Sequence, residues 1–125
     1  MVMASRSDGM GISALKNAGL KLLILSKERN PVVARRAEKL QIEVIQACDN
    51  KLEALTEWLS KNQLPLSQCA YVGNDINDLQ CMQAVKLAIA PIDAHPLATQ
   101  AAHWRLTRAG GKGAIRELSD AIINC

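Results

Sequence analysis

Short apolar runs alternate with stretches of helical periodicity along most of the chain. The apolar runs have the length of buried strands, and they cover 20–25, 42–45, 69–72, 87–90 and 104–107. The stretches with apolar residues at helical spacing cover 9–17, 32–40, 51–61, 78–85, 96–102 and 113–122. Parallel neighbour strands need a crossover connection, and a crossover helix packs back on the sheet. The alternation therefore predicts an α/β fold in which helices flank a parallel sheet.

Two of the predicted helices have start signals. Asn30 precedes Pro31, a pair that suits the capping residue and the first residue of a helix. Asp49 or Asn50 can cap the helix 51–61, because both side chains accept hydrogen bonds from the first helical N–H groups. Both helices thus begin shortly after a predicted strand.

The composition narrows the classes of protein to consider. With 125 residues the chain has room for one domain, 1–125, and 49% hydrophobic residues are enough for a core. Aromatic residues make up only 2%, which leaves little to build the stacking surface of a single-stranded nucleic-acid binder. A net charge of +3 suits an anionic small ligand and falls short of a nucleic-acid footprint. We therefore expect no nucleic-acid partner.

The spacing of the cysteines and the first residues of the chain indicate in which cellular compartment the protein is found. The four cysteines contain no CxxC pair and have no histidine at zinc-finger spacing, which favours reduced thiols. The first residues lack the apolar core of a signal peptide, and no apolar run approaches the roughly 18 residues that a membrane span needs. These features predict a cytoplasmic protein without a membrane partner.

In an open parallel sheet, the residues just after the strands line the ligand site. Ser26, Lys27 and Arg29 follow the first predicted strand and stand directly before a helix start. A hydroxyl, free backbone N–H groups and two cations can together hold a phosphate. The alternative is that Ser26 only ends the strand and that the two cations are solvated.

Lys51 stands at the start of a predicted helix, where a cation opposes the helix dipole. A nearby anion would offset this cost. A lysine held against a phosphoryl group would also stabilise the negative charge of that group during a reaction. The alternative is a solvated lysine on a capped helix.

The strongest local pattern follows the third predicted strand. Gly73 permits a close backbone approach, and Asn74, Asp75 and Asp78 present three oxygen-bearing side chains within five residues. Carboxylate and amide oxygens are typical ligands of Mg²⁺, which keeps several of its waters. The alternative is a structural loop, because Asx side chains also favour turns.

Two histidines and a glycine-rich segment are better explained by structural roles than by catalysis or nucleotide binding. His95 precedes Pro96 and His103 precedes Trp104, and both histidines fit structural roles in loops. The segment GGKG at 110–113 lacks the spacing of a phosphate-binding P-loop.

Taken in order, these features resemble a known family. Ser26 after a strand, Lys51 at a later helix start and the segment GNDIND at 73–78 are similar to motifs two, three and four of the haloacid dehalogenase superfamily of phosphotransferases. Within it, the chain resembles the 3-deoxy-manno-octulosonate 8-phosphate phosphatase group in the strings RSDGMGI, LSKERNPVVARR, YVGNDINDL, DAHP and GGKGAIRE. It is especially similar to the phosphatase-type domain at the C-terminus of some acylneuraminate cytidylyltransferases, the CMP-sialic acid synthetases.

The resemblance implies a fold and a set of residue roles. The fold would be a three-layer, Rossmann-type parallel sheet between helices. Ser26, Lys27 and Lys51 would bind the phosphoryl group, and Lys51 would act with Asp78 in catalysis. The ligands of Mg²⁺ would be the oxygen-bearing side chains of the acidic loop, Asn74, Asp75 and Asp78.

The chain departs from the family pattern in two places. At position 74 many relatives have Asp, and Asn74 offers an oxygen without a charge. The family's first motif is an Asp-x-Asp after an initial apolar strand, and it provides the nucleophile; no Asp-x-Asp occurs in this sequence. Relatives place that strand in the middle of the sheet, so the resemblance implies a domain without its first strand. Either the sequence is a piece of a longer one, or the family's role has changed here.

The resemblance supports two functions. The first is a Mg²⁺-dependent phosphatase domain for phosphorylated sugar acids with eight or nine carbons, expected to be inactive as an isolated chain because the nucleophile is absent. The second is a non-catalytic oligomerisation module belonging to an acylneuraminate cytidylyltransferase. The resemblance also implies a homo-oligomer, specifically a tetramer.

Overall fold

The computed structural model describes residues 19–27, 29–107 and 117 of the chain. The described strands are β1 Leu23–Leu25, β2 Glu43–Ile45, β3 Ala70–Val72, β4 Leu87–Ala90 and β5 Trp104–Arg105. The described helices are α2 Pro31–Leu40, α3 Lys51–Lys61, α4 Leu79–Ala84 and α5 Pro96–Ala101, with short 3-10 helices η2 Leu66–Gln68 and η3 Ile76–Asp78. The predicted alternation of strands and helices is confirmed. The predicted helices at 9–17 and 113–122 lie outside the described residues, apart from Glu117.

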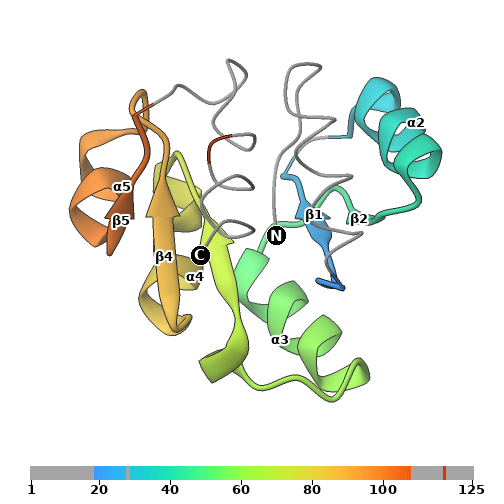
Figure 1. The fold of residues 1–125 in the computed structure, drawn as a ribbon. Coiled ribbons are helices and arrows are strands. Elements are labelled where there is room, and N and C mark those ends of the chain that lie inside the picture. Colours follow the sequence, from blue (N-terminus) through green and yellow to red (C-terminus); the bar gives the residue numbers. More distant parts are fainter. Residues whose placement is uncertain (1–18, 28, 108–116, 118–125) are drawn as a thin grey trace.

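All described strand pairs are parallel, and they form two sheets. β1 pairs with β2, with Ile24 opposite Val44. β4 lies between β3 and β5, with Tyr71 of β3 opposite Ala88. The predicted parallel arrangement flanked by helices is confirmed, although the described strands divide into two sheets rather than one continuous sheet. Figure 1 shows β1 and β3 as the strands that face each other across this division.

The helix start signals in the sequence correspond to real caps. The Asn30 side chain accepts a hydrogen bond from the N–H of Val32 at 2.9 Å, and α2 begins at the proline between them. The Asn50 side chain accepts from the N–H of Glu53 at 3.0 Å, so Asn50 and not Asp49 caps α3. Each cap satisfies a backbone donor that would otherwise lack a partner at the helix start.

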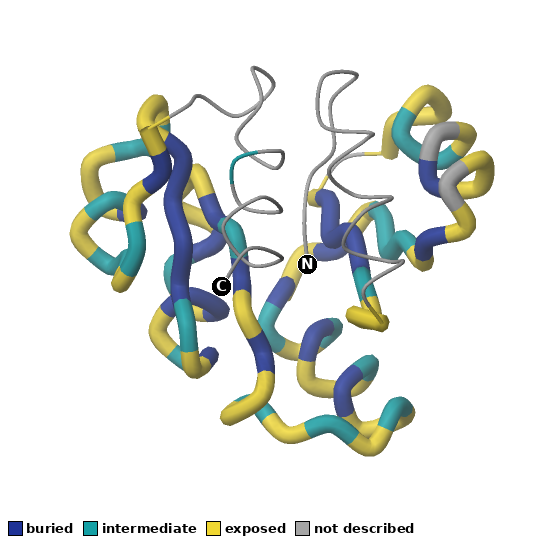
Figure 2. The backbone as a smooth tube through the Cα atoms, viewed as in Figure 1, coloured by how far each residue is buried: buried dark blue, intermediate teal, exposed yellow. Residues whose placement is uncertain are grey.

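One aliphatic core connects the two sheets. Leu23 of β1, Leu55 of α3, Met82 of α4 and Tyr71 of β3 are buried in the same cluster. Figure 2 shows buried stretches along the strands and on the turns of α3 that face them. Side-chain packing therefore holds the two sheets together where the described strands share no hydrogen bonds. Within the described part of the chain, no helix is long and apolar enough to cross a membrane.

We expect the chain to self-associate. Among the described strands, none pairs with β1 on its side away from β2 or with β3 on its side away from β4. Unpaired strand edges favour association between chains, because their backbone N–H and C=O groups can pair with another strand. Sedimentation at micromolar concentration should therefore show species heavier than the 13.6 kDa monomer. A single 13.6 kDa species would contradict this expectation.

Candidate functional site

The carboxyl ends of β1 and β2 bring two segments of the chain together. The N–H of Ser26 donates to the carbonyl of Ile45 at 2.9 Å, and the N–H of Cys48 donates to the carbonyl of Ser26 at 3.1 Å. This pairing continues the parallel ladder beyond the strands and places Ser26 beside the segment that leads into α3. Ser26 is buried, whereas the predicted phosphate ligand Lys27 is exposed at the same edge.

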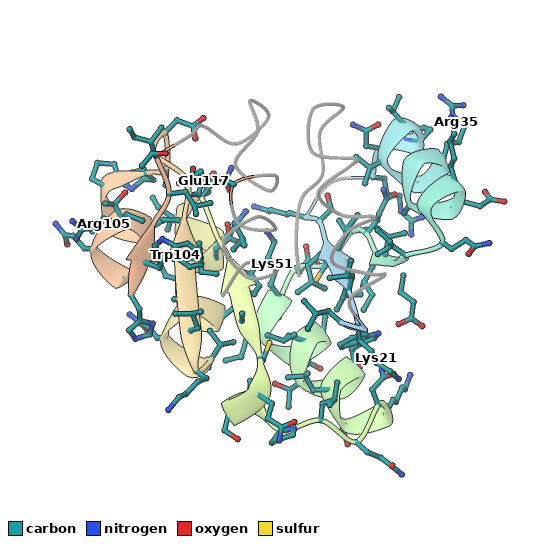
Figure 3. All side chains as sticks on the ribbon, viewed as in Figure 1. Lys21, Arg35, Lys51, Trp104, Arg105 and Glu117 are labelled. Atoms are coloured by element: carbon teal, nitrogen blue, oxygen red, sulfur yellow. The ribbon has the colours of Figure 1, made fainter. Side chains whose placement is uncertain are left out.

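Lys51, the first residue of α3, is almost completely buried. Its side chain retains 6% of its exposure, and its Nζ donates to Asp78 Oδ1 at 2.9 Å and to Asn77 Oδ1 at 3.2 Å. Asp78 supplies the anion that offsets a cation at a helix start. The alternative of a solvated lysine is therefore wrong. Figure 3 shows the Lys51 side chain between the two sheets.

The carboxylate of Asp78 organises the loop after β3. Its Oδ1 accepts from Lys51 Nζ and from the Tyr71 hydroxyl, the latter at 2.5 Å. Its Oδ2 accepts from the backbone N–H groups of Asn74 at 3.0 Å and Asp75 at 3.2 Å. A carboxylate has about four lone-pair positions, and these four donors fill them. The loop thus folds around a buried, fully satisfied carboxylate.

The backbone of the same loop is fixed from its other side. The N–H of Gly73 donates to the carbonyl of Ile89 at 3.0 Å, and the N–H of His95 donates to the carbonyl of Asn74 at 2.8 Å. Asp75 is exposed, and its Oδ1 accepts from the N–H of Ile76 at 2.7 Å. The side chains of Asn74 and Asp75 therefore lie at the surface of a rigid loop, at the carboxyl edge of the β3 sheet.

The three predicted metal ligands differ in how accessible their side chains are. Asn74 and Asp75 are exposed, whereas both oxygens of Asp78 are engaged by Lys51, Tyr71 and the loop backbone. Among the described residues, no group of three or more His, Cys, Asp or Glu side chains is arranged to hold a metal. Mg²⁺ needs only one or two protein carboxylates when waters and phosphate oxygens complete its shell. Asn74 and Asp75 fit such a partial site, and Asp78 fits it only if its present hydrogen bonds break.

Burial determines the protonation of the groups beneath the site. It raises the pKa of Tyr71 far above its ordinary value, and the charge of Asp78 and their hydrogen bond raise it further. Burial also raises the pKa of Cys81 to about 11 and that of Cys48 above its ordinary value. Tyr71 therefore remains a hydrogen-bond donor, and the two thiols are protonated and unreactive near neutral pH.

Sequence reasoning overlooked Tyr71 and Asn77, which both touch the Lys51 and Asp78 pair. The signal for Tyr71 was present, because a tyrosine in an otherwise aliphatic buried strand needs a partner for its hydroxyl. Nothing in the local pattern distinguished Asn77 from an ordinary loop residue.

The two histidines have the structural roles expected of them. His95 Nδ1 accepts from the N–H of Leu97 at 3.1 Å and so caps α5. His103 Nδ1 accepts from the N–H of Ala88 at 2.9 Å, beside the strand ladder. The segment GGKG lies outside the described residues.

Comparison with known proteins identifies the family. The family model of the haloacid dehalogenase-like hydrolases matches residues 14–117. The chain belongs to this family. This confirms the resemblance drawn from Ser26, Lys51 and the acidic loop, and it agrees with the parallel, helix-flanked fold.

The most similar relatives include a group of sugar-acid phosphatases. A 3-deoxy-D-manno-octulosonate 8-phosphate phosphatase from Yersinia pestis is 37% identical over 117 residues, which are 93% of this chain and 63% of that protein. The chain therefore spans less than two thirds of the length of this relative. The corresponding phosphatase from Moraxella catarrhalis, solved with magnesium, phosphate and KDO, is 34% identical with a TM-score of 0.91, over 96% of this chain and 70% of that one. A cobalt-bound phosphatase from Haemophilus influenzae is 31% identical with a TM-score of 0.90, over 98% and 74%.

Replacing Gly73 by alanine should distort the acidic loop. A Cβ at this position would lie 2.6 Å from Met82 Sδ and 2.8 Å from the Cβ of Asp78. Met82 can move, but the Cβ of Asp78 is attached directly to the loop backbone. We expect Gly73→Ala to lower the free energy of unfolding by about 1–3 kcal/mol. Urea denaturation would measure this loss. Asn74→Ala, at the exposed neighbouring position, is the control and should change stability by no more than about 0.5 kcal/mol. Equal stability of Gly73→Ala and the wild type would contradict this account of the loop.

Proposed function

We propose that the site binds a phosphoryl group at Lys51, and that the chain is the phosphate-binding part of a Mg²⁺-dependent phosphatase for phosphorylated sugar acids. This proposal rests on the hydrogen bonds of the Lys51 ammonium group. It has three N–H donors, of which Asp78 and Asn77 take two. Among the described residues no third acceptor contacts it, so one donor remains for an anion.

Two polar residues at the carboxyl end of β1 support a phosphoryl group as the anion. Ser26 ends β1 beside the segment that leads into α3, and Lys27 adds a second, exposed cation. A compact group with several oxygens can accept from such donors at once. The buried Lys51 ammonium binds an anion more strongly than it would in water, because solvent competes less with it.

The substrate class comes from the relatives. The Yersinia pestis and Moraxella catarrhalis proteins are named as phosphatases of 3-deoxy-D-manno-octulosonate 8-phosphate. We propose the same kind of substrate here, a phosphorylated sugar acid. In this proposal Asn74 and Asp75 hold Mg²⁺ through their side-chain oxygens, and the bound ion would neutralise charge on the phosphoryl oxygens.

The described residues can bind and polarise a phosphoryl group, but they do not attack it. In the resemblance, the nucleophile belongs to an Asp-x-Asp strand in the middle of the sheet, and this sequence has no Asp-x-Asp. The division between β1 and β3 supports this view, because a strand between them would join the two parallel sheets. Positioning without a nucleophile gives only part of the rate acceleration.

The second candidate, a non-catalytic oligomerisation module, is favoured by the same division. The facing edges of β1 and β3 have no partner among the described strands, and an assembly of several chains would protect them. The two candidates differ in what Lys51 does, since oligomerisation does not need a free donor on a buried ammonium group.

Phosphate binding tests the first candidate. Titration calorimetry with inorganic phosphate, with and without Mg²⁺, should show binding to the wild-type chain and its loss in Lys51→Met. Lys61→Met is the matched control, because Lys61 is exposed at the other end of the same helix and should not affect affinity. Thermal unfolding would establish that each variant is folded. Absence of binding to the wild type, or equal binding to Lys51→Met, would refute the proposed site.

Hydrolysis tests the absence of a nucleophile. We expect the purified chain not to hydrolyse an aryl phosphate or a sugar-acid phosphate at an appreciable rate, even with ample Mg²⁺, because the sequence has no Asp-x-Asp to supply the attacking carboxylate. Activity that disappears in both Lys51→Ala and Asp75→Ala would contradict this expectation, since it would require a nucleophile within this chain.

A further inference from the structure

We propose that Tyr71 is a positioning residue for the anion site: its hydroxyl holds Asp78 Oδ1, so that the carboxylate neutralises Lys51 only in part. This inference rests on the proposed phosphate-binding function of Lys51. It assigns a role to a buried polar group that neither binds the phosphoryl group nor contacts solvent.

The geometry places both donors on one oxygen. Tyr71 is the middle residue of β3 and is 2% exposed. Its hydroxyl lies 2.5 Å from Asp78 Oδ1, and Lys51 Nζ lies 2.9 Å from the same atom. One neutral and one cationic donor therefore meet at this oxygen, and the lysine shares its counter-ion with the hydroxyl.

Because Tyr71 and Lys51 share Asp78 Oδ1, more of the positive charge of Lys51 is available to an anionic ligand. A hydroxyl that donates to a carboxylate oxygen withdraws part of its negative charge, and in a buried network each hydrogen bond polarises its neighbours. The Tyr71 hydroxyl has Asp78 Oδ1 as its acceptor, and a carboxylate only accepts, so the proton of this hydrogen bond comes from the tyrosine. Without the hydroxyl, Lys51 would be the only donor on that oxygen among the described residues, and the tighter pair would leave less positive charge for an anion.

The hydroxyl also helps to hold the loop. Asp78 Oδ2 accepts from the N–H groups of Asn74 and Asp75, so the orientation of the carboxylate fixes that part of the backbone. Tyr71 and Lys51 hold Oδ1 while the two amides hold Oδ2, so four donors restrict rotation of the carboxylate about its terminal bond. Loss of the hydroxyl would remove one of these four constraints and loosen both amides.

A purely structural role for Tyr71 is the competing explanation. Its ring is part of the core that contains Leu23 and Leu55, and a phenylalanine would keep that packing. Tyr71→Phe therefore isolates the hydroxyl. A structural role predicts lower stability alone, whereas the positioning role also predicts weaker anion binding and faster amide exchange in the loop.

The test measures both properties in the full chain. In Tyr71→Phe, we expect the dissociation constant of inorganic phosphate to rise about tenfold, the equivalent of one net hydrogen bond, and the amides of Asn74 and Asp75 to exchange with deuterium faster. Ile42→Val is the matched control, since it removes one methyl group from a separate buried cluster and lowers stability without touching the site. It should change neither phosphate affinity nor exchange at these two amides.

The outcomes separate this inference from the proposed function. If phosphate binds equally well to Tyr71→Phe and the wild type, the positioning role is wrong while the phosphate site stands. If the wild type binds no phosphate, the proposed function fails, and exchange at Asn74 and Asp75 alone decides whether Tyr71 positions Asp78. Exchange and affinity changes of equal size in Ile42→Val would also overturn the inference, because they would follow from stability alone.

Discussion

The buried ion pair between Lys51 and Asp78 is the interaction on which the candidate site depends. It joins the first residue of α3, which packs in the core with β1, to the loop after β3. Burying two charges costs several kcal/mol each, and their attraction compensates only when further hydrogen bonds satisfy the remaining donors and acceptors. Here Tyr71 and two backbone N–H groups complete the shell of Asp78. The main role of the pair is therefore to orient Lys51 and the loop after β3, and its net contribution to stability is smaller.

The same arrangement explains how the site combines rigidity with a free donor. All four acceptor positions of Asp78 are occupied, whereas the Lys51 ammonium has only two acceptors, Asp78 and Asn77, among the described residues. The carboxylate thus serves the lysine and the loop, and the side chains of Asn74 and Asp75 are left at the surface of that loop. This division of roles is the basis for our proposal that Lys51 binds phosphate and that Asn74 and Asp75 hold a metal ion. In the same proposal the chemical step needs an Asp-x-Asp, which this sequence does not contain.

The sequence predicted those features of the structure that depend on residues close together along the chain. Asn30 with Pro31, and the polar pair before Lys51, marked the helix starts, because capping is a local interaction. The acidic loop was recognised as a site because its oxygen-bearing residues are close in sequence. The burial of Lys51 was not predicted, since its partner Asp78 is 27 residues away and is reached only through the fold. Tyr71 was missed for a related reason. Its place in an apolar, buried strand indicates that its ring packs in the core, but it does not indicate which residue accepts from its hydroxyl. Apolar runs of equal length do not tell which strands pair, so the division into two sheets did not follow from the apolar pattern; it agrees with the resemblance, which implies that a strand in the middle of the sheet is missing.

A double-mutant cycle on Lys51 and Asp78 tests the central claim most directly. Urea unfolding would give the free energies of Lys51→Met, Asp78→Asn and the double variant. The account predicts that each single change is costly, because it leaves a buried charge without its partner, and that the double variant loses less than the sum, with a coupling energy of about 1–3 kcal/mol. Losses that add to within about 0.5 kcal/mol would show that the two residues act independently, and the account of the site would be wrong.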